Sequence, residues 1–273
     1  MKNIKVITLE HISIAELTDI WNRCWRGYYY DMTYTPEHLK TWLHLSQVFL
    51  QDSRAIIVED QVVGFALLSV DGSDGWVAGT CIAPNYRRKG LFTPLMHSLL
   101  NSATCLRLKR VYLEVLVQNH ALKVYQSVGF TRVRPLNIYR DQCRIHYPPP
   151  RKAAVRSLER VSIEQYFTNR RSALFIPGWQ RREGYLKRYR HSLAVMNLAG
   201  TAGALFAGVK NTLCIDAWSA TESGAEEVIS ALPSRTGSSF TLINQPEDWI
   251  VAGLSAYGII PSAKQFEMCV ELT

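Results

Sequence analysis

The sequence predicts an α/β fold of two similar units, each built on a mixed, mostly antiparallel sheet flanked by helices. Three observations support this expectation. Short apolar runs typical of strands alternate with segments that show helical spacing of apolar residues. A proline-rich segment at residues 147–151 (YPPPR) cannot continue a helix or a central strand, so we interpret it as a linker. The order of elements before this segment recurs after it, which predicts one domain in residues 1–145 and another in residues 151–273.

Local signals mark the elements of the first half. Ser13–Glu16 reads as a capping box that opens a helix ending at Gly27. Thr35-Pro36 is typical of the start of a second helix, whose apolar stripe would extend to Phe49. A turn at residues 60–61, between two apolar runs, predicts a hairpin. We expect strands at residues 3–9, 55–59, 62–70, 76–83, 111–117 and 132–140, and further helices at residues 91–104 and 120–128.

The second half repeats this order as a pattern rather than as identical residues. The match pairs Gly203 with Gly64 and Gly258 with Gly129. It also places a serine cap before the first helix of each half. The matched segments are Ile12–Glu16 with Val161–Gln165, residues 55–68 with 193–206, residues 76–83 with 212–219, and residues 121–130 with 248–259.

The chain has 273 residues and a formal net charge of +8, which is unevenly distributed. Residues 151–190 contain eleven Lys and Arg against three Asp and Glu, whereas residues 211–273 contain two against eight. A basic surface attracts nucleic acid, but also any other anion. The basic segment has few of the interleaved aromatic residues of a single-strand binder. We therefore expect a solvated helix surface there and no nucleic-acid partner.

No segment approaches the ~20 consecutive apolar residues that a membrane span requires. The first residues also lack the apolar core of a signal peptide. The cysteines are scattered, without the close spacing of a metal site, which predicts free thiols in a reducing cytoplasm and no bound metal. They are Cys24, Cys81, Cys105, Cys143, Cys214 and Cys269.

The stretch Thr80–Leu100 (TCIAPNYRRKGLFTPLMHSLL) combines a strand, a basic turn and a helix. A helix N-terminus presents unpaired N–H groups and the positive end of the helix dipole to an anion. Arg87–Lys89 add three cations, and Gly90 lets the backbone approach an anion closely. The stretch therefore predicts a site for a phosphate-bearing ligand. The matching Ser219–Glu227 has no cation and three glutamates, which would repel a phosphate.

A second motif, Leu113–Phe130 (LEVLVQNHALKVYQSVGF), follows at the expected distance. Together, the two motifs resemble those of the GNAT superfamily of acyl-CoA-dependent N-acetyltransferases. IAPNYRRKGLFTPLM resembles its pyrophosphate motif V-x-P-x-[YF]-R-x-x-G-x-[GA], and the second resembles L-x-V-x-x-x-N-x-x-A-x-x-x-Y-x-x-x-G-F. The resemblance covers about residues 3–140. Phe92 departs from it, because the family usually has Gly or Ala at that place.

The resemblance implies acetyl-CoA as co-substrate and an amine of a small molecule or peptide as acceptor. Strand 76–83 would splay from strand 111–117, so that the pantetheine arm can add itself like a short strand. The implied cofactor-binding residues are the backbone of Cys81, Ile82 and Ala83, then Arg87, Arg88, Lys89, Gly90, Leu91, Phe92 and Thr93 around the pyrophosphate, with Asn119 and Tyr125 near the arm.

The expected chemistry is attack of an amine on the thioester, with departure of a thiolate. Tyr125 is placed to protonate that thiolate, because a phenol with an ordinary pKa near ~10 is protonated at neutral pH. Glu114 is the candidate general base, acting through a water, and its rivals are Asp19, Asp31 and His120.

The loop between the first two helices carries four tyrosines, and the resemblance implies that it lines the acceptor side. We expect Tyr28, Tyr30 and Tyr34 to bind substrate, or else the loop simply covers the sheet edge. The second unit lacks the phosphate turn, and Leu254 stands where the first has Tyr125, so we expect a degenerate unit that is structural, closes the acceptor cleft or forms a homodimer. The alternatives are a CoA-binding or partner-binding protein that has lost its chemistry, and a nucleic-acid binder that uses residues 151–190.

Overall fold

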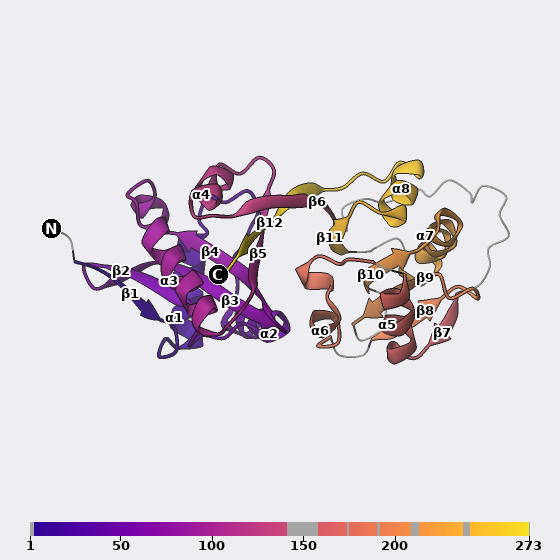
Figure 1. The fold of residues 1–273 in the computed structure, drawn as a ribbon, viewed down its shortest axis with the longest axis horizontal. Helices are drawn as coiled ribbons and strands as arrows, with labels where there is room; N and C mark the ends of the chain where they lie inside the picture. Colours follow the sequence, from indigo (N-terminus) through magenta and orange to yellow (C-terminus); the bar gives the residue numbers. More distant parts are fainter. Residues whose placement is uncertain are drawn as a thin grey trace. The chain divides into compact units, whose positions relative to one another are not determined.

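The computed structural model describes residues 3–140, 158–173, 175–189, 192–208, 213–236 and 241–272. The expected linker at residues 147–151 and Cys143 lie outside the described residues, so the division at 145 and 151 stays a prediction. The chain separates into two compact units, which we describe one at a time (Figure 1). Unit 1 consists of Met1–Val133 with Met268–Thr273, and unit 2 of Arg134–Glu267.

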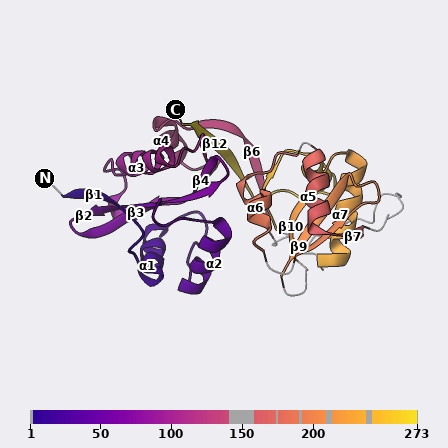
Figure 2. The same ribbon diagram turned by 60° about the horizontal axis from the view of Figure 1, so that its bottom comes forward.

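Unit 1 contains a sheet with strand order β1-β2-β3-β4-β5. Neighbouring strands are antiparallel except β4 and β5, which are parallel, so the expected mixed, mostly antiparallel sheet is confirmed. Helices α1 and α2 cover one face of the sheet, and α3 and α4 cover the other (Figure 2). The elements are β1 (Ile4–Thr8), α1 (Ile14–Cys24), α2 (Pro36–Ser46), β2 (Arg54–Val58), β3 (Gln61–Asp71), β4 (Asp74–Ile82), a 3₁₀-helix (Pro84–Tyr86), α3 (Phe92–Cys105), β5 (Arg110–Leu116) and α4 (Ala121–Ser127).

The predicted helix starts are confirmed by cap geometry, whereas two helix ends differ. Helix α1 ends at Cys24 rather than at Gly27. The Ser13 hydroxyl accepts from the Glu16 N–H at 3.2 Å, and the Thr35 hydroxyl accepts from the His38 N–H at 3.3 Å. Helix α2 ends at Ser46, because Gln47 adopts a left-handed conformation with φ 52°. Phe49 therefore lies beyond the helix, and its expected place in the apolar stripe of α2 is wrong.

The α1 face of the sheet is filled with aromatic rings. Trp21 is buried and stacks on Phe65 of β3 and on Tyr34 of the loop that follows α1, with ring centroids 5.4 and 5.3 Å apart. Trp42 of α2 packs against Trp21 at 5.1 Å. Aromatic contacts of this kind add to the free energy gained by burying the rings. The loop between α1 and α2 is thus anchored to the core at Tyr34.

The last residues of the chain belong to unit 1, which no sequence pattern indicated. Strands β6 (Thr131–Tyr139) and β12 (Ala263–Glu271) each begin in one unit and end in the other. Within unit 1, the end of β12 lies between β5 and the beginning of β6 (Figure 1). The Thr131 hydroxyl donates to the Cys269 carbonyl at 3.3 Å, and the Leu272 N–H donates to the Lys109 carbonyl at 2.8 Å. The final strand therefore completes the sheet of unit 1.

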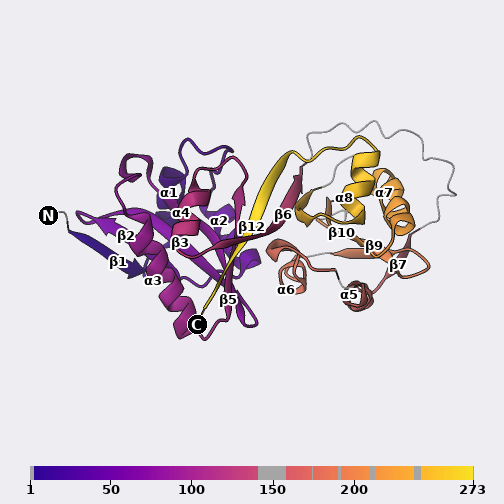
Figure 3. The ribbon, with the colours of Figure 1, turned by 45° about the horizontal axis from the view of Figure 1, so that its top comes forward.

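Unit 2 has an antiparallel sheet with strand order β10-β9-β8-β7, and its β11 pairs with β6. Helix α5 covers one face of this sheet, and α7 and α8 lie on the other (Figure 3). The elements are β7 (Glu159–Val161), α5 (Ile163–Ser172), a 3₁₀-helix (Trp179–Arg181), α6 (Glu183–Leu186), β8 (Leu193–Met196), β9 (Ala202–Ala207), β10 (Leu213–Ser219), α7 (Glu222–Thr236), β11 (Leu242–Pro246) and α8 (Trp249–Ala256).

The two units share the order of elements that the sequence pattern predicted. Ser162 caps α5 by accepting from the Gln165 N–H at 3.0 Å, as Ser13 caps α1. Gly64 and Gly203 also occupy equivalent places. A Cβ at Gly64 would lie 2.8 Å from the Cys81 carbonyl oxygen, and one at Gly203 would lie 2.7 Å from the Val195 carbonyl oxygen. Both positions therefore require glycine, because a neighbouring strand approaches too closely for a side chain.

Candidate active site

Strands β4 and β5 of unit 1 run together only at their first residues. Their parallel register ends at Trp76 opposite Tyr112, whereas β4 stays paired with β3 as far as Ile82. A bulge causes the separation: Leu67 pairs with Gly79 and Leu68 with Val77, which leaves one residue of β4 extra. Such a bulge bends and twists a strand. The expected splay of the two strands is therefore present.

The three residues at the end of β4 and just after it that are expected to contact a cofactor arm differ in their backbone contacts. The Ala83 N–H donates to the Val63 carbonyl at 2.8 Å, and the Ala83 carbonyl accepts from the Tyr86 N–H at 2.8 Å. Both groups of Ala83 are thus engaged within unit 1. Because successive residues of a strand point their backbone groups to opposite sides, Ile82 faces the side from which β5 has diverged.

The turn after β4 presents a series of backbone N–H groups. Arg88 and Gly90 have positive φ angles of 60° and 74°, and Leu91 returns to the right-handed helical region. Within the described part of the chain, the N–H groups from Arg88 to Phe92 donate to no hydrogen-bond acceptor. Alternation of left- and right-handed residues directs such groups into one concavity that suits an anion. The helix dipole of α3 adds to this preference.

Two of the three basic side chains of this turn donate to backbone carbonyl groups of the chain itself. The Arg87 guanidinium donates to the carbonyl oxygens of Ile82 at 2.9 Å and of Cys24 at 3.0 Å. The Lys89 ammonium donates to the Asn85 carbonyl at 2.7 Å. The backbone of the turn, rather than these two cations, is therefore the open anion-binding feature.

Tyr125 projects from α4 and is held by rings on two sides. It is buried, with 8% of its surface exposed. Phe92 meets the Tyr125 ring edge-on at 5.4 Å, and Phe130 does so at 6.2 Å. This contact gives a physical reason for phenylalanine at position 92, where the family pattern has a small residue. Among the described residues, the Tyr125 hydroxyl has no hydrogen-bond partner, and burial raises its pKa, so it is a protonated donor.

Asn119 ties the start of α4 to the tyrosine loop, which we define as residues 28–34. Its side-chain oxygen accepts from the Ala121 N–H at 2.9 Å, which satisfies one amide at the start of α4. Burial raises the pKa of Tyr28 to about 12, and the Asn119 amide beside the Tyr28 hydroxyl partly offsets this shift. The Tyr29 hydroxyl donates to the Gln118 carbonyl at 3.1 Å. The structure thus brings Tyr28, Asn119 and Tyr125 together from separate parts of the sequence.

Glu114 lies on β5 just beyond the point where β4 and β5 separate. The Trp76 indole N–H donates to its carboxylate at 2.6 Å, and Trp76 itself is buried. Sequence reasoning missed this partner, because the register of a parallel pair cannot be read from either strand alone. A carboxylate held in this way stays oriented.

The remaining candidates are less well placed. Asp31 is exposed, and the Thr33 side chain together with the Thr33 N–H, which donates to Asp31 at 2.9 Å, holds the pKa of this carboxyl below its ordinary value. Asp19 and His120 are exposed as well. The Cys81 thiol contacts the Cys24 carbonyl at 2.8 Å, and burial raises its pKa to about 11, so it is a neutral thiol. Tyr30 is exposed, unlike Tyr34, which packs in the core.

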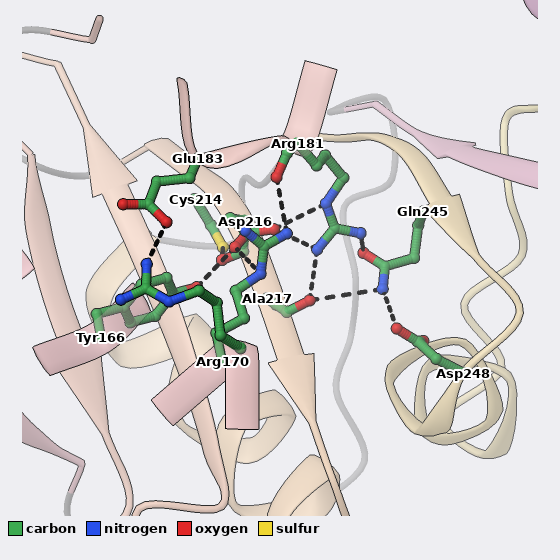
Figure 4. Close-up of polar contacts among 10 residues, drawn as sticks. Tyr166, Arg170, Arg181, Glu183, Cys214, Asp216, Ala217, Gln245 and Asp248 are labelled. Carbon is green, nitrogen blue, oxygen red and sulfur yellow. Dashed lines mark hydrogen bonds and ion pairs between the residues drawn. The ribbon is translucent and has the colours of Figure 1, made fainter. Parts of the chain in front are cut away.

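The equivalent region of unit 2 is filled by a buried arginine (Figure 4). The sequence match places Ala217 of β10 at the position of Cys81. There, Arg181 donates to the Ala217 carbonyl at 2.6 Å and also contacts the side chain of Gln245 on β11. Arg181 is 1% exposed, so the interpretation of residues 151–190 as solvated is wrong for this side chain.

Asp216 supplies the negative charge of this cluster. It accepts from Arg181 Nε at 2.7 Å and from the Tyr166 hydroxyl at 2.8 Å, and Arg170 Nε lies 3.3 Å away (Figure 4). Arg170 is also buried, which lowers its pKa. At the start of α7, the Thr221 hydroxyl accepts from the Gly224 N–H at 3.1 Å. One N–H at the start of α7 is therefore bound within unit 2, and the stretch Ser219–Glu227 carries no cation.

Asp248 makes the stability of unit 2 depend on pH. Burial raises its pKa to about 6, above the ~3.9 of an unfolded aspartate. The folded state therefore binds the proton more tightly, and this stabilisation is present below pH ~4 and lost as the pH rises through about 6. Across that pH range, the unfolding free energy of the wild type should fall by an amount on the order of 2–3 kcal/mol because of this group. Asp248→Asn should not show this fall. Urea unfolding at several pH values measures the unfolding free energy, and Asp19→Asn, at an exposed position, is the control. If the unfolding free energy of Asp248→Asn changed with pH as steeply as that of the wild type, the prediction would be contradicted.

Two further properties concern only the described residues. They contain no group of three or more His, Cys, Asp or Glu side chains able to hold a metal ion. None of their helices is both long and apolar enough to cross a membrane.

Comparison with known proteins agrees with this geometry. Residues 14–130 match the acetyltransferase (GNAT) family. No curated protein matches the chain. Among solved structures, a putative acetyltransferase from Pyrococcus horikoshii is 15% identical, with a TM-score of 0.65 over 100% of this chain and 90% of that one. A GCN5-related N-acetyltransferase from Sphaerobacter thermophilus is 11% identical, with a TM-score of 0.68 over 98% and 95%.

A tandem GNAT protein from the clavulanic acid biosynthesis pathway is 13% identical, with a TM-score of 0.66 over 98% of both chains. These likenesses establish the fold of the whole chain, and the family match covers the part of unit 1 that holds both motifs. Residues 14–130 are thus similar to the acetyltransferase (GNAT) family, and the chain as a whole has the fold of the tandem GNAT protein.

Proposed function

We propose that unit 1 transfers an acetyl group from acetyl-CoA to a primary amine of a small molecule or peptide, by direct attack of the amine on the thioester. One observation carries the proposal. Beyond Trp76, β4 and β5 leave a gap in the sheet. A turn of open N–H groups lies on one side of this gap, and on the other lies the buried Tyr125 phenol, which has no hydrogen-bond partner among the described residues. A co-substrate with a diphosphate, an amide-rich arm and a thioester needs these three features in this order.

The described residues fit acetyl-CoA on two counts. The turn offers the backbone N–H groups from Arg88 to Phe92 for the pyrophosphate, and a Cβ at Gly90 would meet nothing within 4 Å. On β4, the Ile82 N–H points to the side from which β5 has diverged, where a carbonyl of the arm can accept from it, whereas the Ile82 carbonyl already accepts from Arg87 at 2.9 Å. When bound, acetyl-CoA supplies the activated acetyl group. Asn119 would contact the arm from the start of α4.

In the proposed mechanism, Tyr125 holds the proton that the departing thiolate takes. Its raised pKa keeps the phenol protonated at neutral pH, as a general acid must be. Glu114, oriented by Trp76, accepts the proton of the attacking amine through a water. Tyr28 and Tyr30 would line the acceptor side of the site. We assign unit 2 a structural role, because Arg181 and Gln245 fill its equivalent strand separation.

An acceptor screen tests this function. The full-length protein is incubated with acetyl-CoA and, separately, with a polyamine, an aminoglycoside, free amino acids, peptides with a free N-terminus and lysine peptides. Thiol release is then measured. We expect one class of amine to raise the rate at least tenfold over the amine-free rate. Acetyl-CoA binding by calorimetry without turnover on any amine would favour the alternative of a cofactor-binding protein that has lost its chemistry.

A further inference from the structure

The Arg87 side chain connects the turn that would bind the cofactor to the end of helix α1. Its guanidinium donates to the carbonyl oxygens of Cys24 at 3.0 Å and of Arg26 at 3.4 Å, and to that of Ile82 at 2.9 Å. Cys24 is the last residue of α1. The last carbonyl groups of a helix have no partner within the helix and carry the negative end of its dipole. A guanidinium with several donors therefore suits this position.

The chain that follows α1 leads directly into the tyrosine loop. The Tyr28 ring packs against Trp25 with centroids 4.6 Å apart. Further on, the Tyr28 hydroxyl lies beside the Asn119 amide, and the Tyr29 hydroxyl donates to the Gln118 carbonyl. One end of this loop is thus fixed by Arg87, and its first two tyrosines reach the start of α4, the helix that carries Tyr125.

We propose that Arg87 is a positioning residue for the acceptor side of the site, rather than a cation for the pyrophosphate. The proposal rests on the proposed function of unit 1. By holding the end of α1 against the end of β4, Arg87 places the tyrosine loop beside Asn119.

The geometry separates this role from a simple charge role. The open N–H groups of the turn can bind an anion without the Arg87 side chain. The contacts of Arg87 also use more than one nitrogen of its planar fork, and a lysine cannot reproduce that pattern. A phosphate contact depends on positive charge, whereas the positioning role depends on the guanidinium shape. Arg87→Lys therefore distinguishes the two.

The experiment compares Arg87→Ala, Arg87→Lys and the control Arg160→Ala, an exposed arginine of β7. Limited chymotrypsin digestion reports on the tyrosine loop, and calorimetry measures the Kd for acetyl-CoA. We expect both Arg87 variants to be cut within residues 28–34 at least fivefold faster than the wild type. Their Kd values for acetyl-CoA should change less than threefold. In the control, both the digestion rate and the Kd should equal those of the wild type. Once an acceptor is known, its KM should rise at least tenfold in both variants.

Two outcomes would overturn the proposal. One is a tenfold weaker Kd for acetyl-CoA in Arg87→Ala that Arg87→Lys restores, with digestion unchanged. The other is wild-type digestion of both variants. Circular dichroism establishes that each variant is folded before digestion. If the wild type fails to bind acetyl-CoA at all, the proposed function fails, but the digestion rates still decide whether Arg87 orders the loop.

Discussion

Replacing Tyr125 by phenylalanine is expected to lower kcat by ~10²–10⁴, because a general acid contributes about that factor. The ring contacts with Phe92 and Phe130 remain in the variant, so only the hydroxyl is lost. The Kd for acetyl-CoA should stay within threefold of the wild type. Steady-state kinetics with the acceptor found by the screen, together with calorimetry, measure both quantities.

The pH profile separates the acid role from a packing role. Burial raises the pKa of Tyr125 above its ordinary value near ~10, so in the wild type this group should cause no loss of kcat up to pH 9. Tyr189→Phe, which removes a phenol from unit 2, is the matched control. Full activity of Tyr125→Phe across the pH range would exclude Tyr125 as the acid.

Replacing Asp216 by alanine is expected to destabilise unit 2 by ~3–5 kcal/mol, because it leaves two buried guanidinium groups without their shared counter-charge. Asp216 has no exposed surface, and Arg170 and Arg181 are 4% and 1% exposed. The variant also removes the acceptor of the Tyr166 hydroxyl. Urea unfolding followed by tryptophan fluorescence measures the loss.

Glu183→Ala provides the comparison for this prediction. Glu183 pairs with Arg171 and Lys187 at partly exposed positions, where ion pairs contribute ~0–1 kcal/mol. A loss in Asp216→Ala as small as that in Glu183→Ala would contradict the account of the buried cluster. Such a result would mean that the two guanidinium groups reach water or another counter-charge.

The parts of the fold that the sequence predicted well are those with local signals. The serine caps, the strand, turn and helix around Gly90, and the helix that carries Tyr125 each depend on neighbouring residues. The splay of β4 from β5 followed from the family resemblance, and the bulge opposite Leu67 and Leu68 gives it a physical cause. The repeat was detectable because both halves use the same caps and glycines.

What the sequence could not predict depends on pairing between distant segments. The contact of Trp76 with Glu114 depends on a parallel register, and the place of the final strand in unit 1 depends on pairing across more than half of the chain. The cluster around Arg181 joins residues of three separate segments, so in the sequence these residues are indistinguishable from solvated charges. The sequence also does not indicate where a side chain points: the Arg87 guanidinium binds carbonyl groups of the chain itself.

Hydrogen exchange with and without saturating acetyl-CoA tests the central claim most directly, namely that unit 1 alone holds the co-substrate. We predict slower exchange in peptides that cover residues 80–93 and 113–130, and no change in those that cover residues 213–224 and 242–256. Calorimetry on the same sample should give one equivalent of acetyl-CoA per chain. Protection confined to unit 2, or a second bound equivalent, would contradict the account.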